Sequence, residues 1–214
     1  MVVGSTGLIG SSLVHQLIEG GEPVKALARG DQITSNPFLE YIKVDFDALE
    51  LDSESFSDIK DIYICLGTTF KKAGSKAAFQ KVDIQYSIDV ARDAEKNGAR
   101  NLSIITSVGS DSGSSNFYLK TKGLIEEKIS GLDFDSISIH RPGLLIGSRK
   151  ESRSGESIGQ ILQPFLVNPF LIGRLTKYRS VESEVLAKAM IRLSGFKKGV
   201  TFYYFDDFFD KKSI

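Results

Sequence analysis

The chain has 214 residues, 41% of them hydrophobic and 25% charged, which suits a soluble protein that buries the core of one ordinary domain. Its 27 basic and 27 acidic side chains balance, so net charge gives no reason to expect binding to nucleic acid or an acidic membrane. The single Cys65 excludes an internal disulfide framework, and no apolar run reaches membrane-spanning length, so we expect a cytoplasmic protein.

The chain opens with a glycine-rich turn between a strand and a helix. Residues 2–3 have the character of a strand end, and the glycine-rich stretch 4–10 follows them. Apolar residues at 13–18 recur at helical spacing until the glycine pair at 20–21 stops the helix. Only three residues precede the first glycine, fewer than a buried strand needs, so we expect further residues upstream of this sequence.

Strand and helix patterns then alternate along most of the chain. The patterns predict strands at 23–29, 40–46, 61–67, 101–108, 134–141 and 199–205, and helices at 75–97, 116–130 and 181–194. This alternation predicts an α/β fold, a Rossmann-type doubly wound parallel sheet with helices on both faces. We expect one domain over residues 1–214, with residues 148–180 as a small substrate-side insertion near the carboxyl ends of the strands.

The glycine-rich turn is a candidate nucleotide site. Glycines there would let backbone N–H groups approach a pyrophosphate at the start of the following helix. A plain turn is the alternative, but the strand before and the helix after favour dinucleotide binding. The candidate contact residues of this turn are Gly4, Thr6, Gly7, Leu8, Ile9 and Gly10.

The end of the second strand indicates which dinucleotide to expect. An acidic residue there would hold the ribose 2′-hydroxyl of NAD, whereas an arginine accommodates a 2′-phosphate. Arg29 lies at this position and Asp31 comes only after it, so we favour NADP, with NAD as the alternative. Asp45, after the third strand, could accept from the adenine amino group or simply belong to a turn. Further candidates for the cofactor follow the fourth strand: Leu66, Gly67 and Thr68.

Tyr118 and Lys122 are four residues apart on an expected helix, and Ser107 lies at the end of the strand before it. A carbonyl–alcohol reaction by hydride transfer needs a proton donor at the substrate oxygen. A tyrosine has a pKa of about 10, and a neighbouring ammonium would lower it toward working pH. Two unrelated polar residues on one helical face are the alternative. The order of glycine turn, strand-end serine and tyrosine–lysine pair favours a catalytic interpretation.

These motifs resemble the short-chain dehydrogenase/reductase superfamily in its extended or atypical branch. More narrowly, residues 65–83, 117–129 and 141–156 resemble the Tat-interacting oxidoreductase-like group and its bacterial relatives. The resemblance implies a Rossmann fold, NADP(H) binding and a Ser107–Tyr118–Lys122 site in which Lys122 also contacts the nicotinamide ribose. It further implies that three residues lie beside the nicotinamide: Pro142, Gly143 and Leu144. The serine-to-tyrosine gap is shorter than in the best-known members of the superfamily.

Three functions follow from this sequence. The first is an NADP(H)-dependent oxidoreductase acting on a small carbonyl or alcohol. The second is an NADPH-binding regulatory or interaction protein with little catalysis. The third is a sugar-nucleotide epimerase, which the short region after the sixth strand disfavours.

Two C-terminal stretches bear on partners. Six basic residues against two acids lie between positions 149 and 179, which indicates an anionic substrate or a solvated loop. The aromatic residues of 201–210 indicate docking of the last strand, and secondly an oligomer contact, so we expect a monomer or homodimer. His15 and His140 are too far apart for metal-ligand spacing, and no metal is expected.

Overall fold

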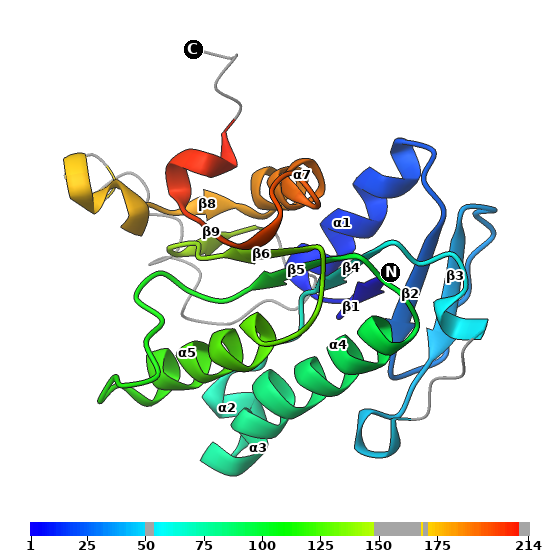
Figure 1. Cartoon of the computed structure of the whole chain (residues 1–214), viewed down its shortest axis with the longest axis horizontal. Helices are drawn as coiled ribbons and strands as arrows, with labels where there is room; N and C mark the ends of the chain where they lie inside the picture. Colours follow the sequence, from blue (N-terminus) through cyan, green and yellow to red (C-terminus); the bar gives the residue numbers. More distant parts are fainter. Residues whose placement is uncertain (50–53, 148–167, 169–170, 210–214) are drawn as a thin grey trace.

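The fold is built on a seven-stranded parallel sheet in the order β3-β2-β1-β4-β5-β6-β9 (Figure 1). The computed structural model describes residues 1–49, 54–147, 168 and 171–209, and every structural statement below refers to these. The strands are β1 (Val2–Val3), β2 (Val24–Ala28), β3 (Leu39–Lys43), β4 (Asp61–Ile64), β5 (Asn101–Ile105), β6 (Ser136–His140) and β9 (Gly199–Tyr203). All the expected strands are present, and the predicted doubly wound α/β fold is confirmed.

Helices cover both faces of this sheet (Figure 1). One face carries α1 (Leu8–Glu19) and α7 (Ser183–Leu193), which pack against each other. The other carries α3 (Lys76–Gln80), α4 (Tyr86–Lys96) and α5 (Phe117–Ser130). Because side chains alternate along a strand, Val2 belongs to the core under α1 and α7 while Val3 belongs to the core under α4 and α5.

The helix expected at 75–97 differs from a regular α-helix in one respect. A π-helical segment, η3 (Lys81–Gln85), joins α3 to α4, so the helical stretch contains a local widening. A short helix, α2 (Phe70–Ala73), precedes it and was not expected from the periodicity. The Thr69 hydroxyl accepts from the Lys72 N–H (3.3 Å), and Gly74 ends α2 in the left-handed conformation (φ 76°).

Smaller elements complete the described chain. They are the 3₁₀ helices η1 (Phe46–Ala48), η2 (Glu54–Phe56), η5 (Gly173–Tyr178) and η6 (Phe205–Phe208), and a second parallel sheet of β7 (Leu145–Ile146) and β8 (Val181–Glu182). Most of the expected insertion, 148–180, lies outside the described residues, so its substrate-side role stays a prediction. The last strand docks as expected, because Tyr203 and Phe208 are buried under α7. None of the described helices combines the length and the apolar character needed to cross a membrane.

His140 is a buried histidine in the core beneath α7. Its side chain is fully buried, its ring stacks on Tyr203 with centroids 5.4 Å apart, and neither ring nitrogen has a hydrogen-bond partner among the described residues. Burial, reinforced by the Arg192 charge, lowers the pKa of His140 from 6.5 to about 3. The folded protein therefore contains this ring in its neutral form.

We expect acid to destabilise the fold through His140. Because its pKa is depressed in the folded state, the unfolded chain binds the extra proton, and stability is lost as the pH falls from 6.5 toward 3. The loss contributed by this residue is about 2 kcal/mol by pH 5. Urea unfolding at pH 7 and pH 5 measures it, and His140→Phe is expected to remove most of the difference.

The control for this prediction is His15→Gln, because His15 is the second histidine of the sequence and its side chain is 72% exposed beside Glu19. This variant should retain the wild-type difference between the two pH values. An unchanged pH dependence in His140→Phe would contradict the assignment.

Candidate active site

The parallel sheet brings the predicted site residues to one edge of the molecule. Because all seven strands run the same way, the loops after their carboxyl ends meet along that edge. The glycine turn follows β1, Arg29 follows β2, Asp45 follows β3, Leu66–Thr68 follow β4, Ser107 follows β5 and Pro142–Leu144 follow β6. The fold therefore gathers residues that are far apart in the sequence along one edge of the sheet.

The glycine turn is packed so tightly that side chains would not fit. A Cβ atom on Gly10 would lie 2.2 Å from the Gly4 carbonyl oxygen, and one on Gly4 would lie 2.8 Å from the Cys65 carbonyl oxygen. Gly4 also has φ 80°, and its carbonyl accepts from the Gly7 N–H at 2.9 Å. The Ser5 hydroxyl donates to the Leu27 carbonyl (3.1 Å) and fastens the turn to β2.

This turn fits a dinucleotide pyrophosphate. Gly7 is the N-cap residue of α1 and offers no side chain, and the first turn of the helix contains no acid. The backbone N–H groups in the first turn of α1 are therefore available to an anion that approaches the start of the helix. Thr6 is exposed and Leu8 half-buried, whereas the side chain of Ile9 is in the core, so Ile9 can contact a cofactor only through its backbone.

The end of β2 carries one exposed cation whose neighbouring acid is already paired. Arg29 is exposed in the loop that follows this strand. Asp31 lies 2.9 Å from the Lys43 ammonium, which holds the pKa of the Asp31 carboxyl below its usual value. Asp45 is exposed and accepts from the Asp47 N–H (2.9 Å), so its carboxylate caps η1. The turn role considered for Asp45 is therefore present.

Lys122 is a buried lysine that forms an ion pair with Asp83. Its Nζ lies 2.5 Å from the Asp83 carboxylate, and the two side chains are 8% and 1% exposed. Burial alone would lower the pKa of Lys122, but the carboxylate outweighs it and raises that pKa above its usual value. The same Nζ lies 6.0 Å from the centre of the Tyr118 ring, so the structure brings the tyrosine–lysine pair together.

Asp83 also connects this pair to the loop after β4. Its second oxygen accepts from the Thr68 N–H at 3.1 Å. The Thr68 N–H therefore already has a hydrogen-bond partner within the protein. Only the hydroxyl and the carbonyl of Thr68 would be left to contact a cofactor. Asp83 lies in the π-helical segment η3, within the helix expected at 75–97, although the periodicity did not predict the π-helical geometry. The sequence contained one indication that Asp83 faces the core. It follows Phe79 by four residues, so the two side chains share a helical face, and Phe79 is buried.

Ser107 lies in the loop that leads from β5 to α5. Its hydroxyl donates to the Val108 carbonyl (3.3 Å), and its carbonyl accepts from the Ser110 hydroxyl (2.7 Å). The loop then runs against α5 at Gly123, where a Cβ atom would lie 2.2 Å from the Ser112 nitrogen. The absence of a side chain at Gly123 thus lets the Ser107 loop approach the helix that carries Tyr118 and Lys122.

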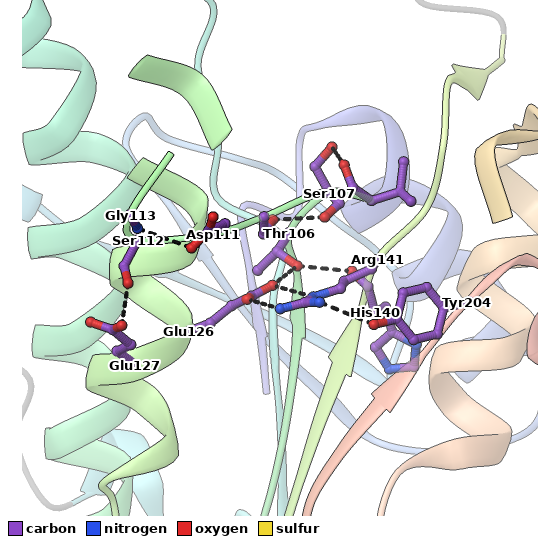
Figure 2. A network of polar contacts seen from close by, with 12 residues as sticks. Thr106, Ser107, Asp111, Ser112, Gly113, Glu126, Glu127, His140, Arg141 and Tyr204 are labelled. Atoms are coloured by element: carbon purple, nitrogen blue, oxygen red, sulfur yellow. Dashed lines mark hydrogen bonds and ion pairs between the residues drawn. The ribbon is translucent and has the colours of Figure 1, made fainter. Parts of the chain in front are cut away.

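A second, partly buried ion pair holds the same region together (Figure 2). The Arg141 guanidinium donates to both oxygens of Glu126, at 2.9 and 2.5 Å, and to the Tyr204 hydroxyl at 3.0 Å. The Thr106 hydroxyl donates to Glu126 (2.6 Å), and the Phe202 ring lies 4.4 Å from the guanidinium carbon. This network joins the ends of β5, β6 and β9 to α5, and the sequence predictions did not include it. The sequence contained one indication of this position. Glu126 follows Lys122 by four residues, so the two side chains lie on the same face of the expected helix.

The residues after β6 lie close to other segments of the candidate site. The Pro142 carbonyl accepts from the Val108 N–H (2.9 Å), next to Ser107. A Cβ atom on Gly143 would lie 2.4 Å from the Arg179 carbonyl oxygen, so only glycine fits where these backbones cross. A Cβ atom on Gly147 would lie 2.7 Å from the Leu8 side chain, which places this segment beside the glycine turn.

Burial raises the pKa of the Cys65 thiol, which argues against a reactive thiolate there.

Comparison with known proteins supports the fold and the family. Residues 1–123 match the model of the NAD-dependent epimerase/dehydratase family. The chain is 34% identical over 188 residues to FMP52 of Candida albicans, a mitochondrial protein, and the match covers 81% of this chain and 79% of that protein. It is 40% identical over 113 residues to rat HTATIP2, covering 53% of this chain and 46% of the rat protein, which confirms the resemblance to the Tat-interacting group.

Solved structures show the same fold at low sequence identity. MoeE5, determined in complex with UDP-glucuronic acid and NAD, has a TM-score of 0.70 and 15% identity, and the alignment covers 94% of this chain and 74% of MoeE5.

The expectation of a cytoplasmic protein is wrong by comparison with the curated relatives. The FMP52 proteins of Candida albicans, Meyerozyma guilliermondii and Emericella nidulans are all mitochondrial. Soluble composition, on which the expectation rested, does not distinguish these compartments.

Proposed function

Because the chain belongs to the NAD-dependent epimerase/dehydratase family, we propose that it is an NADP(H)-dependent oxidoreductase of the short-chain dehydrogenase/reductase type. Its substrate would be a small carbonyl compound or alcohol. The observation that carries this proposal is the position of Tyr118 beside the buried Lys122–Asp83 pair, on the edge of the sheet that also holds the glycine turn.

The proposed roles follow from where the side chains lie. A bound nicotinamide would supply or accept the hydride. The Tyr118 hydroxyl, on a side chain that is 42% exposed, would exchange a proton with the substrate oxygen, and Ser107 would turn its hydroxyl from the Val108 carbonyl to hold that oxygen. The glycine turn would bind the pyrophosphate, with Leu66–Thr68 and Pro142–Leu144 lining the rest of the cofactor.

The buried ion pair changes what Lys122 would do. A lone ammonium would lower the pKa of the neighbouring phenol, as expected from the sequence. Because the Asp83 carboxylate lies 2.5 Å from the ammonium, the two opposite charges largely cancel. The electrostatic effect on Tyr118 is therefore that of an ion pair and weaker than that of a lone ammonium. We therefore assign Lys122 chiefly to holding the cofactor ribose and Tyr118 in position. Asp83 would in turn fix the position of Lys122.

The cofactor preference is tested at Arg29. We propose NADP over NAD because Arg29 is exposed at the end of β2 and Asp31, the nearest acid, is paired with Lys43. Arg29→Ala is expected to weaken NADPH binding about 10- to 100-fold, as for the loss of a charge-assisted contact to phosphate, and to change NADH binding little. Titration of both dinucleotides by fluorescence measures the two dissociation constants.

The matched control is Arg100→Ala, which removes an exposed arginine directly before β5, at the opposite end of the sheet. This variant should bind NADPH nearly as well as the unmodified protein. If unmodified protein bound NADH and NADPH equally, the NADP preference would be wrong. If it bound neither, the proposed function itself would fail.

A second candidate function is a dinucleotide-binding regulatory protein with little turnover. The observation that favours it is that two polar groups of the site already have partners: Lys122 is paired with Asp83, and the Ser107 hydroxyl donates to the Val108 carbonyl. A screen of carbonyl compounds separates the two functions. NADPH oxidation with any of them would favour the oxidoreductase, and high NADPH affinity without turnover would favour the regulatory protein.

A further inference from the structure

One buried carboxylate in α5 receives hydrogen bonds from the ends of two strands. Glu126 is 4% exposed, and the Arg141 guanidinium donates to both of its oxygens, at 2.9 and 2.5 Å (Figure 2). The Thr106 hydroxyl donates to the same carboxylate at 2.6 Å. Arg141 comes directly after β6 and Thr106 directly after β5. A single side chain of α5 thus fastens the starts of two loops.

These contacts lie next to predicted site residues along the chain. Thr106 directly precedes Ser107, and Arg141 directly precedes the segment 142–144, which we expect beside the nicotinamide. The carboxylate itself lies about one helical turn after Lys122. A change in this cluster would therefore move several parts of the candidate site relative to one another, although none of its three members is a predicted site residue.

The guanidinium of Arg141 is held from other sides as well. It donates to the Tyr204 hydroxyl at 3.0 Å, and its carbon lies 4.4 Å from the centre of the Phe202 ring. The Arg141 N–H donates to the Tyr203 carbonyl at 2.9 Å, which ties its backbone to β9. A planar fork that meets a carboxylate with two parallel hydrogen bonds has one preferred orientation. The cluster is therefore built to hold a fixed geometry.

We propose that Arg141 is a positioning residue of the candidate site. Through Glu126 it holds the loops after β5 and β6 in a fixed position relative to Tyr118 and Lys122 on α5. The inference rests on the proposed function and adds the residue that orders the nicotinamide half of the site. The adenine half does not depend on this cluster, because its proposed contacts, the glycine turn and Arg29, follow β1 and β2.

The test compares two ligands that differ by the nicotinamide half. Calorimetry measures the dissociation constants of NADPH and of adenosine 2′,5′-bisphosphate, which retains only the adenine end. Arg141→Met is expected to weaken NADPH binding about 10-fold, as for the loss of one well-placed hydrogen bond, and to leave the bisphosphate nearly unchanged. A loss of folded protein would affect both ligands alike, so the ratio of their affinities reports on position. If the unmodified protein prefers NADH, ADP replaces the bisphosphate.

A second variant separates positioning from stability. Arg141→Met leaves the buried Glu126 carboxylate without its cation and should destabilise the fold. The double variant Arg141→Met, Glu126→Gln leaves no uncompensated charge, and its glutamine can still accept from the Thr106 hydroxyl. We expect it to regain stability in urea unfolding and to retain the weakened binding of NADPH.

The matched control is Asn101→Ala, at the opposite end of β5. Asn101 is 7% exposed and its side-chain amide donates to Asp61 at 3.0 Å, so this variant also loses a buried polar contact. Because it leaves the carboxyl ends of the strands untouched, it should keep the ratio of the two affinities.

An unchanged ratio in Arg141→Met would overturn the proposal, and so would a ratio that recovers together with stability in the double variant. Equal affinity of the unmodified protein for the two ligands would also overturn it, since there would be no nicotinamide contacts to order. Binding of neither dinucleotide would mean that the proposed function fails, and the inference with it. Tight binding of NADPH with an unchanged ratio confines the failure to Arg141.

Discussion

Replacing Asp83 with Asn is expected to lower the free energy of unfolding by about 3–5 kcal/mol. The substitution preserves the shape of the side chain but leaves the Lys122 ammonium without a carboxylate at a site where both side chains are almost fully buried. An unpaired buried charge retains its desolvation cost and loses the compensating attraction. It would also lower the pKa of Lys122, because burial then acts unopposed by its principal partner. Urea unfolding at neutral pH measures the change.

The molecule contains a matched exposed pair. Lys81 and Asp47 are also 2.5 Å apart, but their side chains are 53% and 60% exposed. Asp47→Asn should therefore have a much smaller effect than Asp83→Asn, because water solvates the remaining lysine. The double variant Asp83→Asn, Lys122→Met should recover much of the lost stability, since it leaves no uncompensated charge. If it were as unstable as the single variant, the ion-pair explanation would be wrong.

Replacing Tyr118 with Phe is expected to reduce kcat/KM at least 100-fold for any carbonyl compound that the protein reduces. The phenol would be the proton donor to the substrate oxygen, and phenylalanine has no proton to give. The hydroxyl makes no hydrogen bond to any described residue and the side chain is 42% exposed, so the fold should be insensitive to its removal. Steady-state kinetics and NADPH titration together separate loss of chemistry from loss of binding.

Tyr86→Phe is the control for the loss of a phenol outside the candidate site. The Tyr86 hydroxyl donates to Asp47, on the side of the molecule that carries η1, and turnover should remain near that of the unmodified protein. Retained turnover in Tyr118→Phe would show that another group moves the proton. A large loss of NADPH affinity in the same variant would indicate a binding role for the phenol.

Local patterns were sufficient for most of the fold. The strands and the main helices follow from periodicity, and the glycine turn follows from residues 4–10, because each depends on neighbours in the sequence. The same holds for Tyr118 and Lys122, which share a helical face. The short helix α2 was not expected, since its start depends on a capping hydroxyl at Thr69 and its end on the φ angle of Gly74.

The contacts that organise the site were harder to predict from the sequence. Asp83 reaches Lys122 across 39 positions, and no spacing rule indicates which buried charges will meet after the sheet forms. The bidentate contact of Arg141 with Glu126 has the same origin, because it joins the end of a strand to the middle of a helix. Gly123 lies inside the helix expected at 116–130, and only the three-dimensional structure shows that a loop needs the space beside it.

The order of the strands also determines when the glycine turn can form during folding. β1 is only two residues long and lies between β2 and β4, and its partner in β4 is about 60 residues away along the chain. The Cys65 N–H donates to the Val3 carbonyl, so the glycine turn gains its support only after this distant strand has docked. Such non-local pairing is slow, because the entropy of closing a long loop is lost before the contacts form. We therefore expect the proposed nucleotide site to form late in folding, and a ligand that bound it would stabilise the completed sheet.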